Sequence, residues 1–310
     1  MTFRPAPAFR HIARLAAMAA LVIIAVPAFA QDGDPVEVGA NIEFVGVQSD
    51  IMIEDGDEFD SSGFGARGGI DVDFNLSPRT VARIETDLGV FDYEGEGRET
   101  LTSYGAAASI EHAVSDTVKV RLRARRVHNI AVLEAFSADQ TSVATRVEWE
   151  VGDNRVRVEA EYRERDYDTT SAGNGEGWRL GAQYNRRFGP YHWLRLDARV
   201  EDMTSDDEPR RSYDRRVVAL EYSQPVAKRL RVRPSLEYRE WDYDARIAEG
   251  NPDGDLRRDS YVAPGVELAW GRSASGPYAR ASAEYRFRES NDTRYDESGA
   301  RFGLIVGYRF

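Results

Sequence analysis

Hydrophobic and charged residues alternate along most of the chain after residue 35. The clearest segment covers residues 156–163, where Val156, Val158, Ala160 and Tyr162 alternate with Arg157, Glu159, Glu161 and Arg163. Residues 118–125 and 194–201 show the same split between even and odd positions. A period of two is typical of a β-strand with one apolar and one polar face.

The same alternation predicts about fourteen strands of roughly ten to thirteen residues each. Strands of this length can cross the apolar layer of a membrane at a tilt, and an even number is usual in bacterial single-chain barrels. The predicted fold class is therefore all-β, a closed antiparallel transmembrane β-barrel. The expected strands are 36–47, 64–76, 80–92, 100–112, 117–127, 140–151, 155–166, 177–187, 191–202, 212–222, 229–242, 259–270, 277–288 and 299–310.

The connections between these strands alternate in length. Those after even-numbered strands are short, as at Ser77-Pro78, at Gly152 to Asn154, and from Ser223 to Lys228. Several of those after odd-numbered strands are longer and acidic, as from Ser49 to Gly63 and from Tyr243 to Arg258. Short periplasmic turns opposite longer outer loops are the expected asymmetry of such a barrel, with both termini on the periplasmic side.

Aromatic residues are predicted to form two belts. If strand directions alternate, one group lies near the periplasmic strand ends and a second group lies towards the other rim. Amphipathic rings suit the headgroup level on both sides of a membrane. The first group is Phe74, Trp149, Tyr184, Tyr222, Trp270 and Tyr308, and the second is Tyr162, Trp178, Tyr238, Tyr285 and Phe287.

The first thirty residues have the features of an export signal. Three arginines precede the apolar run 15–26, and Ala28 and Ala30 form an A-x-A cleavage point. The predicted organisation is a signal peptide at 1–30 and an outer-membrane barrel at 31–310. A soluble sandwich or solenoid would also alternate, but it would not need an export signal, two aromatic belts and alternating loop lengths together.

Composition changes this interpretation little. The net charge of -12, the sequence pI of about 5.0 and the mean hydropathy of -0.54 resemble those of a soluble acidic protein. In a transmembrane strand, however, only alternate residues meet lipid, so the average stays low. The chain has no cysteine, so the fold needs neither disulfides nor a thiolate metal site.

The last strand carries a family resemblance. Phe302, Leu304, Val306, Tyr308 and Phe310 alternate and end on a terminal Phe. This pattern resembles the C-terminal signature of bacterial outer-membrane proteins, which implies that the barrel-assembly machinery recognises Tyr308 and Phe310. By strand count, the chain is similar to monomeric fourteen-stranded porins of Gram-negative bacteria. The end from Tyr295 onward resembles, more weakly, accessory secretion barrels such as surface lipoprotein assembly modifiers, which usually carry a helical-repeat domain that has no room here.

The inward positions of such a barrel would be dense in charge. Acidic residues dominate strands one to four, whereas arginine and lysine dominate strands five, eleven and thirteen, so an acidic wall is expected to face a basic one. An alternative is that neighbouring strands pair these charges only to stiffen the barrel. Burying so many charges without water would carry a large desolvation cost, which favours a water-filled lumen. The predicted lumen-lining residues are Asp71, Asp73, Arg83, Glu85, Arg121, Arg123, Arg146, Glu148, Arg157, Glu159, Arg195, Asp197, Arg231, Arg233, Arg280 and Glu284.

These features favour a channel for passive diffusion of small hydrophilic solutes. When only the charges at inward-facing strand positions are counted, the sequence predicts a weak preference for anions. Acidic oligosaccharides are an alternative cargo. The residues expected to contact solute are Arg121, Arg123, Arg231, Arg233 and Arg280. A second hypothesis is an accessory or structural barrel for secretion or envelope integrity, closed by its own Arg and Glu ladders.

An enzyme is the third hypothesis. His128, expected in an outer loop beside Asn129, is the only histidine placed for catalysis, and no catalytic motif accompanies it. We therefore predict no catalytic residue, no cofactor and no metal. The acidic loop Asp50 to Asp60 could bind Ca²⁺ or bridge to lipopolysaccharide, although a solvated, mobile loop is the favoured explanation. Outer-membrane lipid and lipopolysaccharide are the expected surroundings, and the acidic loops argue against nucleic acid.

Overall fold

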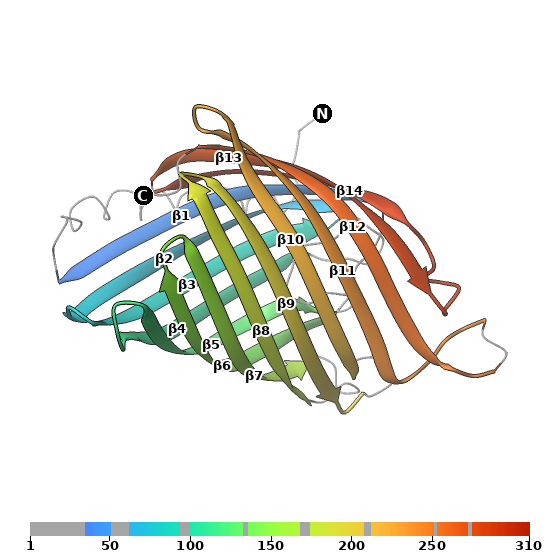
Figure 1. Ribbon diagram of the computed structural model, residues 1–310. Helices are drawn as coiled ribbons and strands as arrows, with labels where there is room; N and C mark the ends of the chain where they lie inside the picture. The colour runs from blue at the N-terminus through green and yellow to red at the C-terminus, as the bar shows by residue number, and fades with distance from the viewer. Residues whose placement is uncertain are drawn as a thin grey trace, which may run out of the picture.

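The computed structural model describes residues 35–50, 62–93, 100–132, 136–167, 174–207, 212–250, 253–271 and 275–310. These residues form fourteen tilted strands in a closed antiparallel barrel (Figure 1), in which each strand pairs with its sequence neighbours and β1 pairs with β14. The predicted fold class is confirmed. The strands are β1 (Val36–Ser49), β2 (Gly63–Ser77), β3 (Thr80–Tyr93), β4 (Leu101–Ala113), β5 (Val118–Val132), β6 (Phe136–Val151), β7 (Asn154–Tyr167), β8 (Asn174–Gly189), β9 (His192–Ser205), β10 (Tyr213–Ala227), β11 (Leu230–Ile247), β12 (Leu256–Gly271), β13 (Gly276–Ser290) and β14 (Gly299–Arg309).

The alternation along each strand separates the two faces of the barrel wall. Apolar residues such as Leu122, Val158 and Leu180 leave about half of their surface uncovered, at 50%, 54% and 53%. A soluble fold would bury side chains of this kind, whereas a membrane barrel presents them to lipid. The charged residues between them point into the barrel. The alternation along each strand therefore produces both the apolar outer surface and the charged inner surface.

Closure joins the two ends of the chain. Asn41 of β1 pairs with Arg309 of β14, Phe44 pairs with Val306, and the Phe310 N–H donates to the Ala40 carbonyl at 2.9 Å. The rings of Tyr308 and Phe310 contact each other, with centroids 4.6 Å apart. Their recognition by the assembly machinery remains a prediction.

The two ends of the barrel differ. At one end, strands are joined by tight connections such as 78–79, 152–153, 190–191 and 228–229. Left-handed backbone at Gly152 and Arg229 allows two of these reversals, with φ of 57° and 66°. Most connections at the opposite end are longer. We call the two ends the short-turn end and the long-loop end.

Several strands extend further towards the long-loop end than predicted. β11 continues to Ile247 rather than 242, and β12 begins at Leu256 rather than 259. Beyond the apolar layer both strand faces meet water, so the alternation ends although the backbone pairing continues. The same effect places His128 within β5, not in a loop, next to a bulge where Asn129 has a φ of 56°.

β10 also differs from its predicted range. The segment from Ser223 was expected to form a turn, but the strand runs on to Ala227 and the reversal occurs at 228–229. Pro225 lies beside an irregularity in the pairing of β10 with β11, the kind of position in a strand that tolerates proline.

The predicted signal peptide and most of the acidic loop at 50–60 lie outside the described residues. The part of the chain that the structure describes contains no helix long and apolar enough to cross a membrane.

Ala281 and Ser282 test the assignment of the two faces, because they are neighbours on β13 with opposite orientations. Ala281 faces outward between Leu268 and Leu304, and Ser282 faces inward beside Glu267. We expect Ala281→Arg to lower the free energy of unfolding in lipid by about 2–4 kcal/mol, because it places a charge in the apolar layer. We expect Ser282→Arg to change it by less than about 1 kcal/mol. Urea unfolding in lipid vesicles measures both, and equal losses would contradict the assignment.

Candidate lumen site

Arginines of β5 reach across β4 to carboxylates of β3. Arg123 lies 3.0 Å from Glu85, and Arg125 lies 3.1 Å from Asp87. The inward residues of β4 between them are small, Ala107 and Gly105 among them, so they leave room for long side chains to lie along the wall. The expected acidic wall facing a basic wall is therefore wrong in this sector, because its charges meet within one wall.

Arg121, Arg83 and Asp73, also predicted to line the lumen, form pairs as well. Arg121 lies 2.7 Å from Glu111, and Arg83 makes a two-pronged contact with Asp73. The carboxylate of Asp71 lies over Gly39, where an added Cβ would come within 2.8 Å of both its oxygens. Glycine at position 39 therefore provides the space that Asp71 occupies.

Predicted residues on β6 to β9 form a second ladder. Arg146 lies 2.6 Å from Glu159, and Arg157 lies 2.5 Å from Glu148. Arg195 contacts both Asp197 at 3.0 Å and Glu221 at 2.5 Å. Each of these side chains is partly exposed, so the pairs fix orientation more than they stabilise the fold.

The remaining predicted residues lie on β11 and β13. Arg233 contacts Glu267 at 2.9 Å, Arg280 contacts Glu43 at 3.1 Å, and Glu284 contacts Arg286. For Arg231, no carboxylate of the described residues lies within ion-pairing distance. It contacts the ring of Tyr191, 4.7 Å from the centroid.

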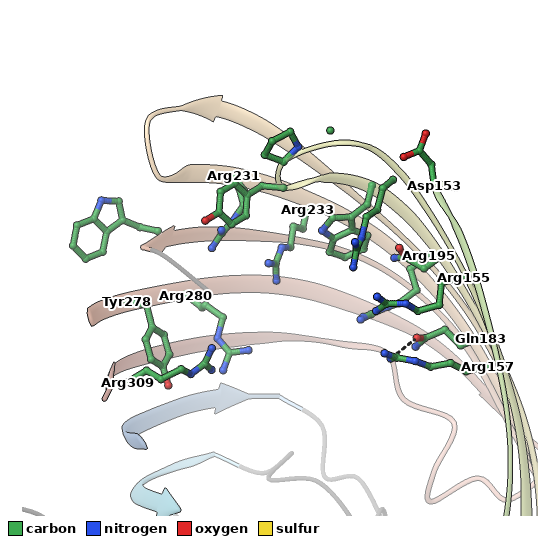
Figure 2. A pocket seen from close by; sticks show the side chains of 17 residues that line it. Asp153, Arg155, Arg157, Gln183, Arg195, Arg231, Arg233, Tyr278, Arg280 and Arg309 are labelled. Carbon is green, nitrogen blue, oxygen red and sulfur yellow. Dashed lines mark hydrogen bonds between the residues drawn. The ribbon is translucent and has the colours of Figure 1, made fainter. Parts of the chain in front are cut away.

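A cavity of about 720 Å³ near the short-turn end gathers arginines from two arcs of the wall. We call it the arginine chamber. Side chains from β7, β8 and β9 on one side, and from β11, β13 and β14 on the other, turn towards one open space (Figure 2). Of its 17 lining residues, Asp153 is the only carboxylate, while eight are arginines: Arg155, Arg157, Arg187, Arg195, Arg231, Arg233, Arg280 and Arg309.

Aromatic rings order the guanidinium groups of the chamber. The Trp193 ring centroid lies 5.3 Å from the Arg195 guanidinium and 5.5 Å from the Arg233 guanidinium. Arg309 lies 5.4 Å from the ring centroid of Tyr278. A cation over a ring is held in place without losing its charge. Trp193 and Tyr278 are not among the predicted lumen-lining residues, although both occupy inward-facing positions of their strands.

A second cavity of about 770 Å³ is lined mainly by the middle of the wall, and it has a different charge balance. Its lining contains five carboxylates, among them Asp71, Glu85 and Glu159, and six arginines, among them Arg123 and Arg179. The basic excess is therefore concentrated in the arginine chamber and is not spread evenly along the barrel.

At the long-loop end, residues 291–298 between β13 and β14 pack against arginines of the wall. We call this segment the Tyr295 loop. The Arg257 guanidinium stacks 3.4 Å from the Tyr295 ring centroid, and Arg246 donates to the Tyr295 hydroxyl at 2.7 Å. Arg257 also contacts Asp259, and both are almost fully buried. Sequence alternation gives no signal for this contact, because the loop has no periodicity.

The Tyr295 loop is tied to the connection between β11 and β12. The Thr293 N–H donates to the Glu249 carbonyl at 3.2 Å, and Arg294 contacts Glu249 at 2.8 Å. Arg294 also donates to the buried carboxylate of Asp292 at 2.8 Å. This hydrogen bond holds the pKa of Asp292 well below its ordinary value, so the carboxylate stays ionised.

None of the three histidines in the described part of the barrel lines the arginine chamber. His128 contacts Asp139 at 2.7 Å and stacks on Tyr104, whose half-exposed ring faces outward. His112 lies 3.0 Å from the Thr80 hydroxyl, and His192 lies 2.6 Å from the Tyr222 hydroxyl. Within the described ranges, no group of three or more His, Asp or Glu side chains has an arrangement that could hold a metal ion.

An apolar exterior and a charged interior on a closed antiparallel wall define a transmembrane β-barrel of the outer membrane. Residues 16–188 match the family model of the outer membrane protein beta-barrel domain, and the chain belongs to this family. No curated protein sequence matches the chain.

Solved structures support the fold. The in-vitro folded outer membrane protein OmpT of Vibrio cholerae aligns with a TM-score of 0.52 and 10% identity, over 91% of this chain and 99% of its own. A loop L8 deletion mutant of that protein aligns with a TM-score of 0.51 and 12% identity, over 89% and 100%. The outer membrane channel DcaP of Acinetobacter baumannii aligns with a TM-score of 0.50 and 10% identity, over 91% and 99%. At these identities the likeness concerns the fold alone.

The contacts of Asp292 predict that the Tyr295 loop resists proteases. We expect Asp292→Ala to speed cleavage within the loop by about tenfold, because loss of a buried charge-assisted hydrogen bond costs about 1.5–3 kcal/mol. Glu297→Gln, at an exposed position of the same loop, is the control and should leave the rate unchanged. Limited proteolysis of the folded barrel measures both, and an unchanged rate in Asp292→Ala would show that these contacts do not hold the loop.

Proposed function

We propose that this barrel is a porin-like channel for passive diffusion of small hydrophilic solutes, with a preference for anions. The observation that carries the proposal is the arginine chamber, where eight arginines and one carboxylate line one cavity. A low-dielectric wall around such a chamber focuses its field and raises the local concentration of anions.

The position of the charge matters more than the net charge of the chain. The protein as a whole carries -12, which by itself would favour cations. Charges more than about 10 Å from the solute are screened at physiological salt, so a solute in the lumen responds mainly to the nearest side chains. In the arginine chamber these are arginines, whose charge is partly offset by wall carboxylates such as Glu148 and Glu267. In the middle cavity the two signs nearly balance, so the expected preference is moderate.

The cavity that each arginine lines refines the set of residues predicted to contact solute; pairing alone does not, because Arg233 and Arg280 also have carboxylate partners. Arg121 of β5 pairs with Glu111 of the neighbouring β4, and Arg123 pairs with Glu85 of β3, away from the arginine chamber. Arg231, Arg233 and Arg280 line the arginine chamber. We therefore assign the anion preference to these last three and count Arg121 and Arg123 as parts of the wall ladder.

In this proposal the short-turn end and both termini face the periplasm. The apolar outer surface contacts lipid and lipopolysaccharide, and Tyr308 and Phe310 serve as the assembly signal. The solutes are small polar molecules, with acidic oligosaccharides as a more specific cargo. DcaP, one of the proteins with a similar fold, is described as an outer membrane channel, which agrees with transport.

Reversal potential under a tenfold KCl gradient tests the preference. We expect discrete conductance steps in planar bilayers and a permeability ratio of chloride to potassium of about 2 to 5. The double variant Arg231→Glu with Arg233→Glu should lower the ratio to about 1 or less, because it removes two positive charges from the chamber and adds two negative ones.

A matched variant controls for total charge. Arg126 and Arg216 face outward, and each side chain is 59% exposed. Arg126→Glu with Arg216→Glu makes the same charge change outside the lumen and should leave the ratio unchanged. A cation-selective wild type, or equal shifts in both double variants, would count against the proposal.

A second candidate function is a structural or accessory barrel with an occluded lumen. It is favoured by the fully buried contact of Arg163 with Glu201, which Arg215 also contacts at 2.7 Å. Such buried pairs support this alternative, because charged side chains that pair with each other fill part of the lumen. The same bilayer recordings separate the two functions, since an occluded barrel would give no conductance steps.

A further inference from the structure

We infer that the arginine chamber is a discrete binding site for a multivalent anion, one carrying two or more carboxylates or phosphates, with Arg231 at its centre. This inference rests on the proposed function, because the ligand reaches the chamber through the lumen. It goes further in predicting saturable binding at named residues, whereas a diffuse basic field would only bias the passage of ions.

Arg231 is buried, and its charge is uncompensated within the described part of the barrel. Only 7% of its surface is exposed, and among the described residues it has no carboxylate partner. Its Nε is buried without a hydrogen-bond acceptor. Its guanidinium lies over the aromatic ring of Tyr191, in the turn between β8 and β9. Burying an uncompensated charge is costly unless an opposite charge arrives to pair with it. The side chain turns into the chamber (Figure 2), where a soluble anion can supply that charge.

The arginines beside Arg231 are held by carboxylates at the wall. Arg233 is held by Glu267, Arg195 by Asp197 and Glu221, and Arg280 by Glu43. A guanidinium has five N–H donors in a fixed fork, so one carboxylate leaves donors for a second partner. Figure 2 shows the side chains of Arg195, Arg233 and Arg280 reaching into the same space. The wall carboxylates therefore pre-organise a set of donors around Arg231.

The two arcs of the chamber favour a ligand with more than one charge. Arg155, Arg157 and Arg195 come from β7 and β9, whereas Arg231 and Arg280 come from β11 and β13. Three strands separate Arg155 and Arg157 of β7 from Arg231 of β11, so a di- or tricarboxylate or a pair of linked phosphates can contact both groups, whereas a single chloride contacts one of them. The volume of about 720 Å³ falls in the range of small-molecule binding pockets.

The middle cavity lacks this arrangement and provides an internal comparison. Arg123 there is inward-facing and lies 3.0 Å from Glu85, so its charge has a partner. Its removal changes the lumen charge by the same amount as removal of Arg231. Arg123→Gln is therefore the matched control for Arg231→Gln.

Citrate block of single channels is the first test, with acetate as the monovalent comparison and sucrose as the neutral one. We expect citrate to interrupt the KCl current at a half-blocking concentration at least about tenfold lower than that of acetate, and sucrose not to block. Arg231→Gln should raise the citrate value about tenfold, and Arg123→Gln should change it less than about twofold. Pyrophosphate, tested in parallel, shows whether linked phosphates bind as well as carboxylates.

Calorimetric titration of citrate onto the folded barrel in detergent is a readout that does not need conduction. Saturable binding that is lost in Arg231→Gln and kept in Arg123→Gln supports the site. Anion-selective conduction without citrate binding, or equal loss in the two variants, overturns the site while leaving the proposed channel intact. Saturable binding in a barrel that gives no conductance steps supports the site and overturns the channel.

Discussion

The constraint on which the structure depends is that lipid offers no hydrogen bonds to a polypeptide backbone. Every N–H and C=O in the apolar layer must find a partner within the protein, so a sheet can cross a membrane only if it has no free edge. Pairing of β1 with β14 meets this requirement by joining the two ends of the chain. The alternation of each strand follows from it, because a closed wall has one face for lipid and one for the lumen.

The inner face then has to accommodate many charges in a confined space. Small residues of β4 let Arg123 and Arg125 lie across that strand to reach carboxylates on β3, and Gly39 makes room for Asp71. Long side chains that lie along the wall narrow the lumen less than side chains that project into it. The same pairs orient the guanidinium groups, which connects the packing of the wall with the electrostatics of the channel.

The charge along the barrel axis is distributed unevenly, and this gives the lumen a direction. The long-loop end has an arginine and aromatic cluster closed by Tyr295, the middle has both signs in near balance, and the arginine chamber lies near the short-turn end. A solute that crosses therefore meets its strongest positive field at one end. Selectivity and binding are both expected to be decided there.

The sequence by itself determined the fold class, the number of strands and the face on which most residues lie, because a period of two is a local property of each strand. It could not identify the partners of the charges, since Arg123 meets Glu85 across an intervening strand. It also missed the Tyr295 loop, which has no periodicity. Arg155, Arg231 and Arg309 are far apart in the chain and line one chamber only because strand register and barrel closure bring them to the same level. Whether a residue faces the lumen or the lipid is set locally by its position in the strand. Which side chains meet depends on strand register, side-chain length and barrel closure.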